Sequence, residues 1–258
     1  MKLPLIMVAP NGARRGKADH PALPVTIAET VETAKACFDA GARGIHAHVR
    51  DENGAHVLDA GLYVELIAQM ENHVPDMAVQ ITTEAVGLYA PASQRQLVRD
   101  VMPNAVSIAL REMLPDDDEL DAVRTFYHWA DEAEIAVQHI LYTPKDVADL
   151  LEYVRRGIVP NSDLQLLFVL GRYAKDQQSQ VKDMDPFLDV LTTRGKSPEK
   201  IQWALCAFGR NETDCLAEAV RRGGKARIGF ENSLWNRDGA LAADNAERVR
   251  ELSAAIGA

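Results

Sequence analysis

The feature that most constrains the fold is a regular alternation of short apolar segments with longer amphipathic ones. Eight short runs, rich in β-branched and other apolar residues, occupy residues 3–9, 42–49, 76–83, 105–110, 134–141, 164–170, 200–208 and 225–231. Each run is followed by a segment in which apolar residues recur at helical spacing. Alternation of this kind predicts a parallel sheet whose strands are joined by right-handed helical crossovers.

Eight strand–helix units in 258 residues match a (β/α)8 barrel, which typically needs about 250 residues. The alternative is a doubly wound open sheet, which usually carries G-x-G-x-x-G after its first strand. Here the first run leads into PNGARRG, which does not match that motif. We therefore predict an α/β fold, a (β/α)8 TIM barrel that occupies residues 1–258 as a single domain. The active site of such a barrel lies at the C-terminal ends of the strands.

Composition narrows the classes of partner and the compartment. The net charge of −10 argues against a nucleic-acid-binding protein, which needs a basic surface for phosphates. The three cysteines, Cys37, Cys206 and Cys215, show no C-x-x-C spacing and are expected to be reduced thiols. No apolar run approaches the roughly 20 residues that span a bilayer, and the N-terminus does not resemble a signal peptide. We expect a cytoplasmic protein without a membrane or nucleic-acid partner.

A pair of histidines on the second predicted strand is the strongest sign of chemistry. Residues two apart in a strand project to the same side, so His46 and His48 can both face the barrel mouth. Catalytic zinc takes three protein ligands and keeps one open position. Glu231 is our third ligand, because it ends an apolar run on the eighth strand, where a carboxylate needs a partner. The alternative is a hydrogen-bonded polar core without a metal.

Competing interpretations concern the partners of these groups. Glu231 could instead pair with Arg50 or Arg227, and His139 on the fifth strand is a rival ligand or a substrate contact. The other histidines fall in expected loops or helix faces. We expect surface positions for His20, His56, His73 and His128.

Arginines at the strand ends suggest an anionic ligand. Arg227 has the strand parity of Glu231, and its planar fork suits a substrate carboxylate, although an ion pair with Glu231 or Asp51 is an equal alternative. Further cations in the loops could gather around a phosphorylated ligand or simply be solvated. They are Arg14, Arg15, Lys17, Arg172, Lys175 and Arg210.

Five segments together resemble the β-keto acid cleavage enzymes, whose type member acts on 3-keto-5-aminohexanoate. They are APNGA, DHPALPVT, AGARGIHAHVRDENG, GGKARIGFENSLWNRDG and AADNAERV. The resemblance covers nearly the whole chain and implies a zinc-dependent barrel, usually a homotetramer. It also implies a reaction between two small molecules, a β-keto acid and the co-substrate acetyl-CoA. The products would be acetoacetate and a new acyl-CoA.

The resemblance also assigns roles to individual residues. It implies zinc ligands at His46, His48 and Glu231, and a carboxylate-binding arginine at Arg227. Hydroxyl groups that act in catalysis or substrate binding would be those of Thr82, Thr83 and Ser107. In the first loop, we expect Asn11 and Arg14 to contact the substrate.

Two positions depart from the family pattern. Relatives commonly have an acidic residue where this chain has Arg14, and an Asp where it has Asn232. The amide of Asn232 cannot act as a general base at neutral pH, so we expect Glu84, just past the third strand, to replace it. Arg14 predicts a neutral or anionic substrate tail, for example that of a dicarboxylic β-keto acid.

Two other functions stay open at this point. One is a zinc-dependent lyase or hydrolase on the same barrel that needs no acetyl-CoA. The other is a catalytically degenerate relative that only binds a metabolite, which Asn232 would explain.

Overall fold

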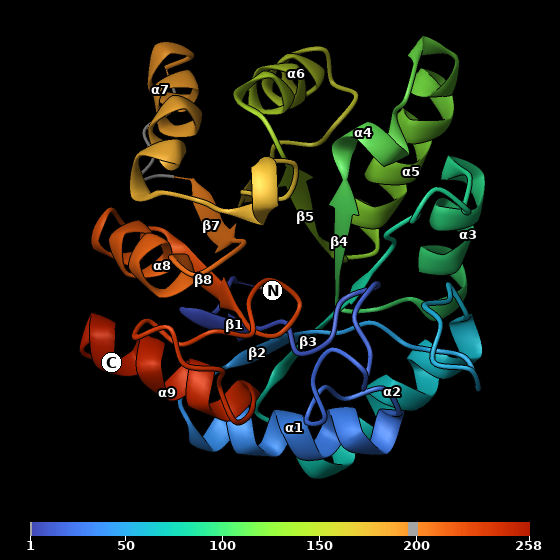
Figure 1. The fold of residues 1–258 in the computed structure, drawn as a ribbon. Coiled ribbons are helices and arrows are strands. Elements are labelled where there is room, and N and C mark those ends of the chain that lie inside the picture. Colours follow the sequence, from blue (N-terminus) through green and yellow to red (C-terminus); the bar gives the residue numbers. More distant parts are fainter. Residues whose placement is uncertain (1, 196–200) are drawn as a thin grey trace.

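A closed barrel of eight parallel strands forms the centre of the molecule. The computed structural model describes residues 2–195 and 201–258. Each strand pairs with its neighbours in chain order, and the first and last strands pair to close the barrel (Figure 1). The strands are β1 (Ile6–Val8), β2 (Gly44–His46), β3 (Ala78–Thr82), β4 (Ala105–Ala109), β5 (Ala136–Leu141), β6 (Gln165–Leu170), β7 (Gln202–Ala207) and β8 (Lys225–Ile228). The predicted (β/α)8 fold is confirmed, and the open sheet was the wrong alternative; the expected start of the seventh strand, residue 200, lies outside the described residues.

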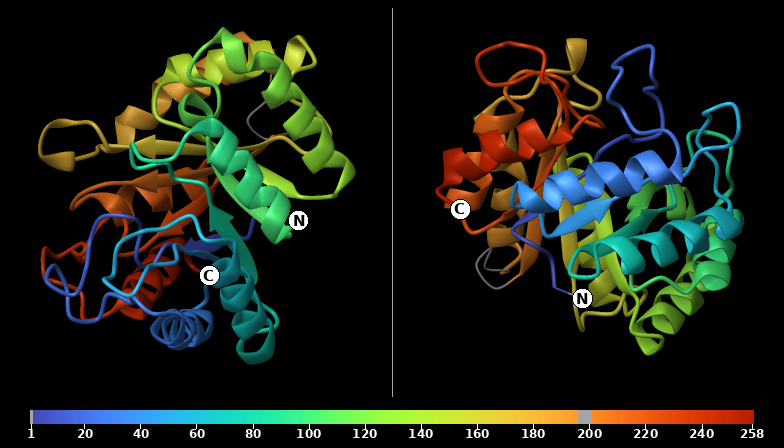
Figure 2. Two further views of the ribbon diagram at one scale, coloured as in Figure 1. Left: turned by 90° about the vertical axis from the view of Figure 1, so that its right-hand side faces the viewer. Right: turned by 90° about the horizontal axis from the view of Figure 1, so that it is seen from below.

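Helices surround the barrel on its outer side (Figures 1 and 2). They are α1 (Ile27–Asp39), α2 (Ala60–His73), α3 (Pro91–Val101), α4 (Leu110–Met113), α5 (Leu120–Glu132), α6 (Pro144–Arg155), α7 (Asp185–Thr193), α8 (Glu212–Arg221) and α9 (Asn245–Ile256). Short 3-10 turns lie at η1 (Asp117–Glu119), η2 (Lys175–Gln177) and η3 (Val181–Met184). In the described part of the chain, no helix is both long enough and apolar enough to cross a membrane.

Local sequence signals explain where the first helix begins and ends. Thr26 Oγ1 accepts a hydrogen bond from Glu29 N at 3.2 Å, and the Glu29 carboxylate accepts one from Thr26 N at 3.1 Å. This reciprocal capping box satisfies two amide groups that the first turn of a helix leaves without partners. The helix ends at Asp39 with Ala40 as its C-cap, and Gly41 follows with a φ of +116°, a conformation that other residues rarely adopt.

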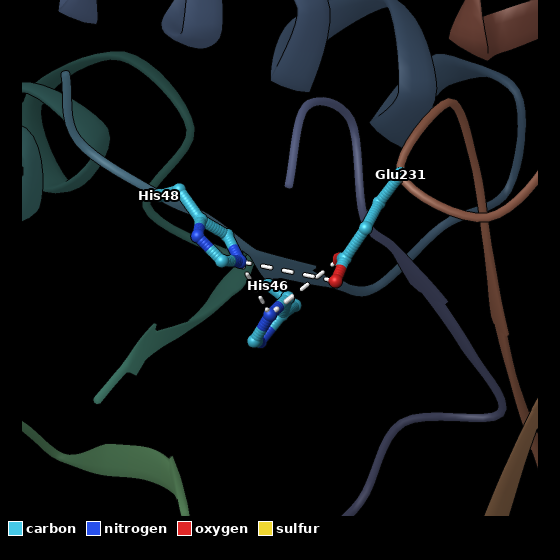
Figure 3. Close-up of side chains that lie close together, drawn as sticks. All are labelled: His46, His48 and Glu231. Atoms are coloured by element: carbon cyan, nitrogen blue, oxygen red, sulfur yellow. Dashed lines mark hydrogen bonds and ion pairs between the residues drawn. The ribbon is translucent and has the colours of Figure 1, made fainter. Parts of the chain in front are cut away.

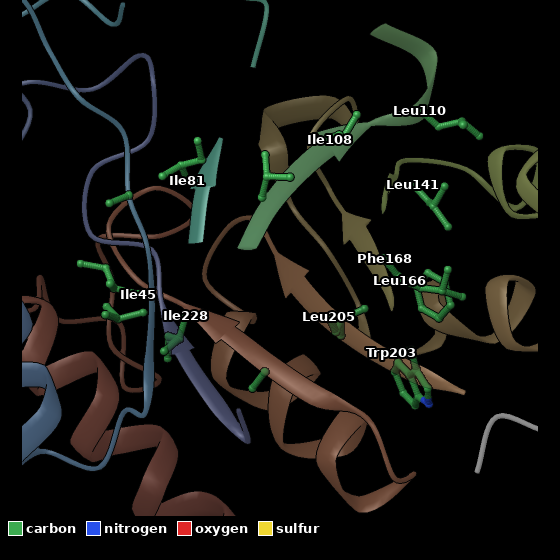
Figure 4. Packing of buried hydrophobic residues seen from close by; sticks show 14 of the residues in the cluster. Ile45, Ile81, Ile108, Leu110, Leu141, Leu166, Phe168, Trp203, Leu205 and Ile228 are labelled. Atoms are coloured by element: carbon green, nitrogen blue, oxygen red, sulfur yellow. The ribbon is translucent and has the colours of Figure 1, made fainter. Parts of the chain in front are cut away.

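Alternation along the strands separates two environments. Ile45, Ile81 and Ile108 belong to the large apolar layer between the strands and the helices (Figure 4). Their neighbours in sequence therefore face the barrel interior. A smaller apolar cluster that includes Leu167 and Cys206 fills part of that interior. The three cysteines are buried free thiols, as predicted.

Candidate metal centre and active site

Three predicted ligand groups converge at the mouth of the barrel. His46 ends β2, His48 lies two residues further on, and Glu231 lies three residues beyond β8 (Figure 3). The two Nε2 atoms are 3.2 Å apart. Glu231 Oε2 lies 3.6 Å from His46 Nε2, and Glu231 Oε1 lies 3.9 Å from His48 Nε2. The strands end earlier than expected, so His48 and Glu231 sit in loops, but the three side chains still meet as a candidate metal-binding group.

A chain of amides fixes which nitrogen of His46 carries the proton. Gln138 Nε2 donates to the carbonyl of Leu166 at 3.5 Å, which leaves its oxygen to accept from Gln80 Nε2 at 3.1 Å. Gln80 Oε1 then faces His46 Nδ1 at 2.9 Å and can only accept from it. The proton of His46 therefore lies on Nδ1, and its Nε2 presents a lone pair to His48 and Glu231.

A second series of hydrogen bonds fixes the position of the proton on His48. His56 Nε2 lies 3.0 Å from the carbonyl of Glu84 and donates to it, so His56 Nδ1 is an acceptor. His48 Nδ1 lies 3.3 Å from this acceptor and donates to it, which leaves a lone pair on His48 Nε2. Asn11 holds the main chain of His48 from both sides, since Nδ2 donates to the carbonyl at 2.9 Å and Oδ1 accepts from the amide at 3.3 Å.

The prediction that His56 is a surface residue was therefore wrong. Its side chain is only 6% exposed. Residues 51–55 turn the chain back on itself, and an antiparallel bridge between Arg50 and His56 brings the imidazole beside His48. The Asn53-Gly54 pair is a typical turn signal and could have identified this approach.

The donor set fits a cation. Burial lowers the pKa of His46 to about 4 and lowers the pKa of His48 well below its ordinary value, so both rings are neutral at neutral pH. Burial opposes ionisation of Glu231, but the neighbouring Arg227 and His46 lower its pKa. Glu231 Oε2 is buried without a hydrogen-bond donor. Two lone pairs and a carboxylate that face one point repel each other unless a positive group lies between them, and nitrogen and carboxylate ligands are those of zinc and related metals.

Arg227 lies beside this group on β8 and has unused donors. Its Nη2 is 3.4 Å from Glu231 Oε1 and 3.6 Å from Cys206 Sγ, so the alternative ion pair is formed. However, its buried Nε and Nη1 have no partner among the described residues. Arg50 is not the partner of Glu231: its guanidinium donates instead to main-chain carbonyls, among them that of Gly54 at 2.9 Å.

Glu84 projects into the same space from just beyond β3. Its carboxylate lies 3.9 Å from His48 Nε2 and 3.5 Å from Arg172 Nη2. Burial, followed by the negative charge of Glu231, raises the pKa of Glu84 to about 7, and Arg172 opposes this rise. A carboxyl group in this setting can exchange protons near neutral pH.

The predicted hydroxyl residues lie on the wall of the site and are buried. Thr82 Oγ1 accepts from Glu84 N at 3.1 Å, and Ser107 Oγ lies 3.5 Å from His46 Nδ1. Thr83 Oγ1 donates to the carbonyl of Ser107 at 3.4 Å. Thr82 also lines a small internal cavity together with His46 and Arg227.

Some of the predicted loop cations gather at an adjoining cavity of about 110 Å³. Arg14, Arg15 and Arg172 line it, together with Glu84 and Glu231. Arg15 Nη1 donates to the carbonyl of Glu231 at 3.1 Å, so this arginine supports the loop. The other predicted cations do not line this cavity. They are Lys17, which pairs with Glu29 at 2.8 Å, Lys175, and Arg210, which stacks on Trp235.

Two further histidine predictions were wrong. His139 belongs to the outward-facing register of β5 and packs against the ring of Tyr127 at 5.2 Å, so it is neither a ligand nor a substrate contact. Strand parity decides this, because the inward-facing neighbour is Gln138. His20 is only 3% exposed, and its Nε2 lies 2.9 Å from the carbonyl of Ala242. His73 and His128 are exposed, as expected.

One buried neighbour of the Glu231 loop was not predicted from the sequence. Glu212 begins α8 and is fully buried behind the loop that carries Glu231. Its carboxylate accepts from the side chain of Asn232 at 3.3 Å. A glutamate in an amphipathic helix is usually solvated, so periodicity alone offered no signal for this contact.

Comparisons with known proteins find similarity along nearly the whole chain. The family model described as "beta-keto acid cleavage enzyme" matches residues 4–258. A 3-keto-5-aminohexanoate cleavage enzyme of Fusobacterium nucleatum is 24% identical over 254 residues, 96% of this chain and 89% of the relative. A 3-oxoadipate:acetyl-CoA acetyltransferase of Cupriavidus necator is 24% identical, over 97% of this chain and 87% of the relative.

Solved structures share the fold at lower identity. A binary complex of ObcA with oxaloacetate superposes with a TM-score of 0.70 at 16% identity, and covers 89% of this chain. This chain spans 62% of the length of that one. A type I 3-dehydroquinate dehydratase from Clostridium difficile has a TM-score of 0.63 at 13% identity, and covers 100% of this chain and 92% of its own.

Proposed function

The chain belongs to the β-keto acid cleavage enzyme family, and from this premise we propose that it is a zinc-dependent acyltransferase. It condenses a β-keto acid with acetyl-CoA and releases acetoacetate and a new acyl-CoA. One observation carries the proposal: unprotonated ligand atoms of His46, His48 and Glu231 meet beside an arginine with unused donors, Arg227. The relative from Cupriavidus necator, whose name specifies a 3-oxoadipate:acetyl-CoA acetyltransferase, supports the co-substrate.

His46, His48 and Glu231 would hold the metal. A bound zinc ion supplies Lewis-acid polarisation of a carbonyl oxygen. Arg227 binds the carboxylate of the β-keto acid through Nε and Nη1, the two buried donors without a partner. This contact holds the substrate so that its C2 carbon faces Glu84.

Glu84 acts as the base in place of an aspartate at position 232. Its carboxylate takes a proton from C2, and the resulting carbanion bonds to the acetyl carbonyl carbon of acetyl-CoA. The CoA thiolate leaves and attacks the original keto carbon. The C2–C3 bond then breaks, and the departing carbon recovers the proton from Glu84, which yields acetoacetate and the new acyl-CoA.

The surrounding polar residues position these groups. Thr82 binds the amide of Glu84, and Ser107 lies against His46, so both hydroxyls border the reacting atoms. Thr83 and Asn11 are engaged with neighbouring main chain, through which they hold the wall and the His48 segment. We keep the homotetramer as a prediction, which a light-scattering mass measurement tests.

Arg14 supports a neutral or anionic substrate tail. It is exposed at the cavity beside Arg172, and no ion pair joins it to the described residues. A cationic tail would meet three arginines there, Arg14, Arg15 and Arg172, whereas a second carboxylate would be attracted to them. A dicarboxylic β-keto acid therefore fits this side of the site.

The test is to incubate the purified protein with zinc, acetyl-CoA and a panel of β-keto acids that differ only in tail charge. We expect acetoacetate and a new acyl-CoA from neutral or anionic acids. Arg227→Lys keeps the charge but loses the planar fork, and should lower kcat/KM about 10- to 100-fold. Turnover without acetyl-CoA would instead support a lyase or hydrolase, and no turnover of any acid would support a degenerate binding protein.

A further inference from the structure

The turn that carries Glu231 is held from behind by a buried carboxylate outside the proposed metal site. Glu212 begins α8 and is completely shielded from solvent. Its Oε1 accepts hydrogen bonds from Gly229 N and from Asn232 Nδ2, each at 3.3 Å. Its Oε2 accepts from Arg248 Nη2 at 2.9 Å. The carboxylate of Glu212 thus binds both ends of the turn and is itself bound to α9 through Arg248.

The rest of the turn is fixed equally firmly. Each main-chain N–H of residues 229–232 has a partner. The acceptors are Glu212 Oε1 at 3.3 Å, Asn245 Oδ1 at 2.9 Å, the carbonyl of Ala9 at 3.1 Å and that of Gly229 at 2.9 Å. The side chain of Glu231 has several rotatable bonds. A main chain held by these four hydrogen bonds fixes the point from which that side chain extends, and so helps to place its carboxylate.

The amide of Asn232 can take only one orientation. Its Nδ2 faces two acceptors, Glu212 Oε1 and the carbonyl of Arg227, both at 3.3 Å. An aspartate here would turn a carboxylate oxygen toward another carboxylate and a carbonyl, and no donor would lie between these three acceptors. The environment therefore requires a donor at position 232.

The surroundings of Glu212 match the ionised form. Three N–H groups, from Gly229, Asn232 and Arg248, point at its two oxygens. Burial raises the pKa of Glu212 to about 7, and Arg248 opposes that rise. The carboxylate satisfies all three donors, whereas a neutral amide in its place would turn its own N–H groups toward at least one of them.

We propose that Glu212 is a positioning residue for Glu231, and that Asn232 is its matched hydrogen-bond donor. Glu212 acts through the turn and touches neither the metal ligands nor the proposed substrate position. The proposal rests on the proposed function, because it assumes that Glu231 binds a metal. It follows that Asn232 is not a defective base, and that Asp at this position harms the site in this chain.

Glu212→Gln tests the proposal with zinc alone, without substrate. Competition against a chromophoric chelator should show zinc affinity reduced about tenfold, the effect that lost support of a ligand commonly has. Thr213→Val is the matched control. It removes a hydroxyl bonded to Arg248 and Glu251 in the same buried network but does not touch the turn, so zinc affinity should stay unchanged. Thermal unfolding of both metal-free variants separates lost stability from lost affinity.

A second experiment on the same proposal uses substitutions at position 232. Asn232→Asp should also weaken zinc binding, and adding Glu212→Gln to it should recover part of the loss, because donor and acceptor are then exchanged. Equal zinc affinity in wild type and Glu212→Gln would overturn the proposal, as would tighter zinc binding by Asn232→Asp. If wild type itself binds no zinc, the proposed function fails instead.

Discussion

At the scale of single residues, hydrogen-bond partners decide what each histidine can do. His46 and His48 each give the Nδ1 proton to an acceptor whose own orientation is set further away, by the carbonyls of Leu166 and Glu84. Both rings therefore point a lone pair at one place. Partners behind metal-binding imidazoles commonly fix the tautomer in this way. His139 is also a buried imidazole, but it faces the surrounding helices and therefore does not reach the candidate metal-binding group.

The ligand residues should control metal content. We expect about one zinc per wild-type chain, and loss of this metal in His46→Ala and in Glu231→Ala, because two ligands alone bind weakly. Mass spectrometry of the dialysed proteins for metal content checks this. His73→Ala, at an exposed position, should keep its metal. Metal retained in both ligand variants would contradict the assignment.

His139 should make the fold sensitive to acid. Burial lowers its pKa to about 3, against an ordinary value of about 6.5, so the folded protein binds fewer protons there than the unfolded chain. Its contribution to stability is thus complete above pH 6.5 and is lost as the pH falls toward 3. At pH 5 the stability lost in this way amounts to about 2 kcal/mol.

His139→Phe should reduce that loss, so that its free energy of unfolding falls less between pH 7 and pH 5 than that of wild type. Urea unfolding at both pH values measures the difference. His73→Gln, which changes an exposed histidine, serves as the control and should behave like wild type. An identical pH dependence in all three proteins would exclude this role for His139.

At the scale of elements, the site depends on a close approach of two loops. The loop after β1 passes against the loop after β8 at Gly12, which has a φ of +63°. A Cβ atom at this position would lie 2.5 Å from Glu231 Cγ. Only glycine combines this conformation with this contact, so the first loop helps to place the third ligand.

Gly12→Ala should therefore displace Glu231. We expect a loss of about 1–3 kcal/mol in stability, from the clash and the backbone conformation, together with weaker zinc binding. Gly16→Ala in the same loop is the control, because nothing lies within 4 Å of its added Cβ. Chelator competition and urea unfolding measure both effects, and unaltered zinc affinity in Gly12→Ala would show that the side chain of Glu231 avoids the clash.

At the scale of the whole molecule, barrel closure brings together the ends of strands that are distant in the chain. β1 pairs with both β2 and β8, so His46 at the end of β2 and Glu231 in the loop after β8 are separated only by β1 (Figure 1). A metal bound there would link the first and last parts of the barrel. Binding to the folded state alone stabilises it by mass action.

Removal of the metal should therefore lower the melting temperature. At a free zinc concentration of a thousand times Kd, the stabilisation is about 4 kcal/mol, or about 10 °C for a domain of this size. Calorimetry with and without a chelator tests this on the wild-type protein. The His46→Ala variant should melt at the same temperature in both conditions. If its melting temperature shifted as much as that of wild type, the shift would arise from metal bound at another site.

Local patterns in the sequence determined the architecture. Eight alternating apolar runs, the Thr26 cap and the spacing of His46 and His48 depend on periodicity and short-range hydrogen bonding, which a chain reveals by itself. The same parity placed Glu231 near the histidines, although it lies in a loop. Strand parity was harder to assign outside the His46–His48 pair. The prediction that His139 faces the inside of the barrel was wrong.

The pairing of the functional groups, by contrast, depends on contacts between segments that are distant in the chain. The contacts of His56 with His48, of Arg172 with Glu84, and of Glu212 with Asn232 join segments that carry no common pattern. These pairings arise from how loops pack after the barrel closes. They determine tautomers, pKa values and amide orientations, because those properties depend on the nearest charges and donors in space and not on neighbours along the chain.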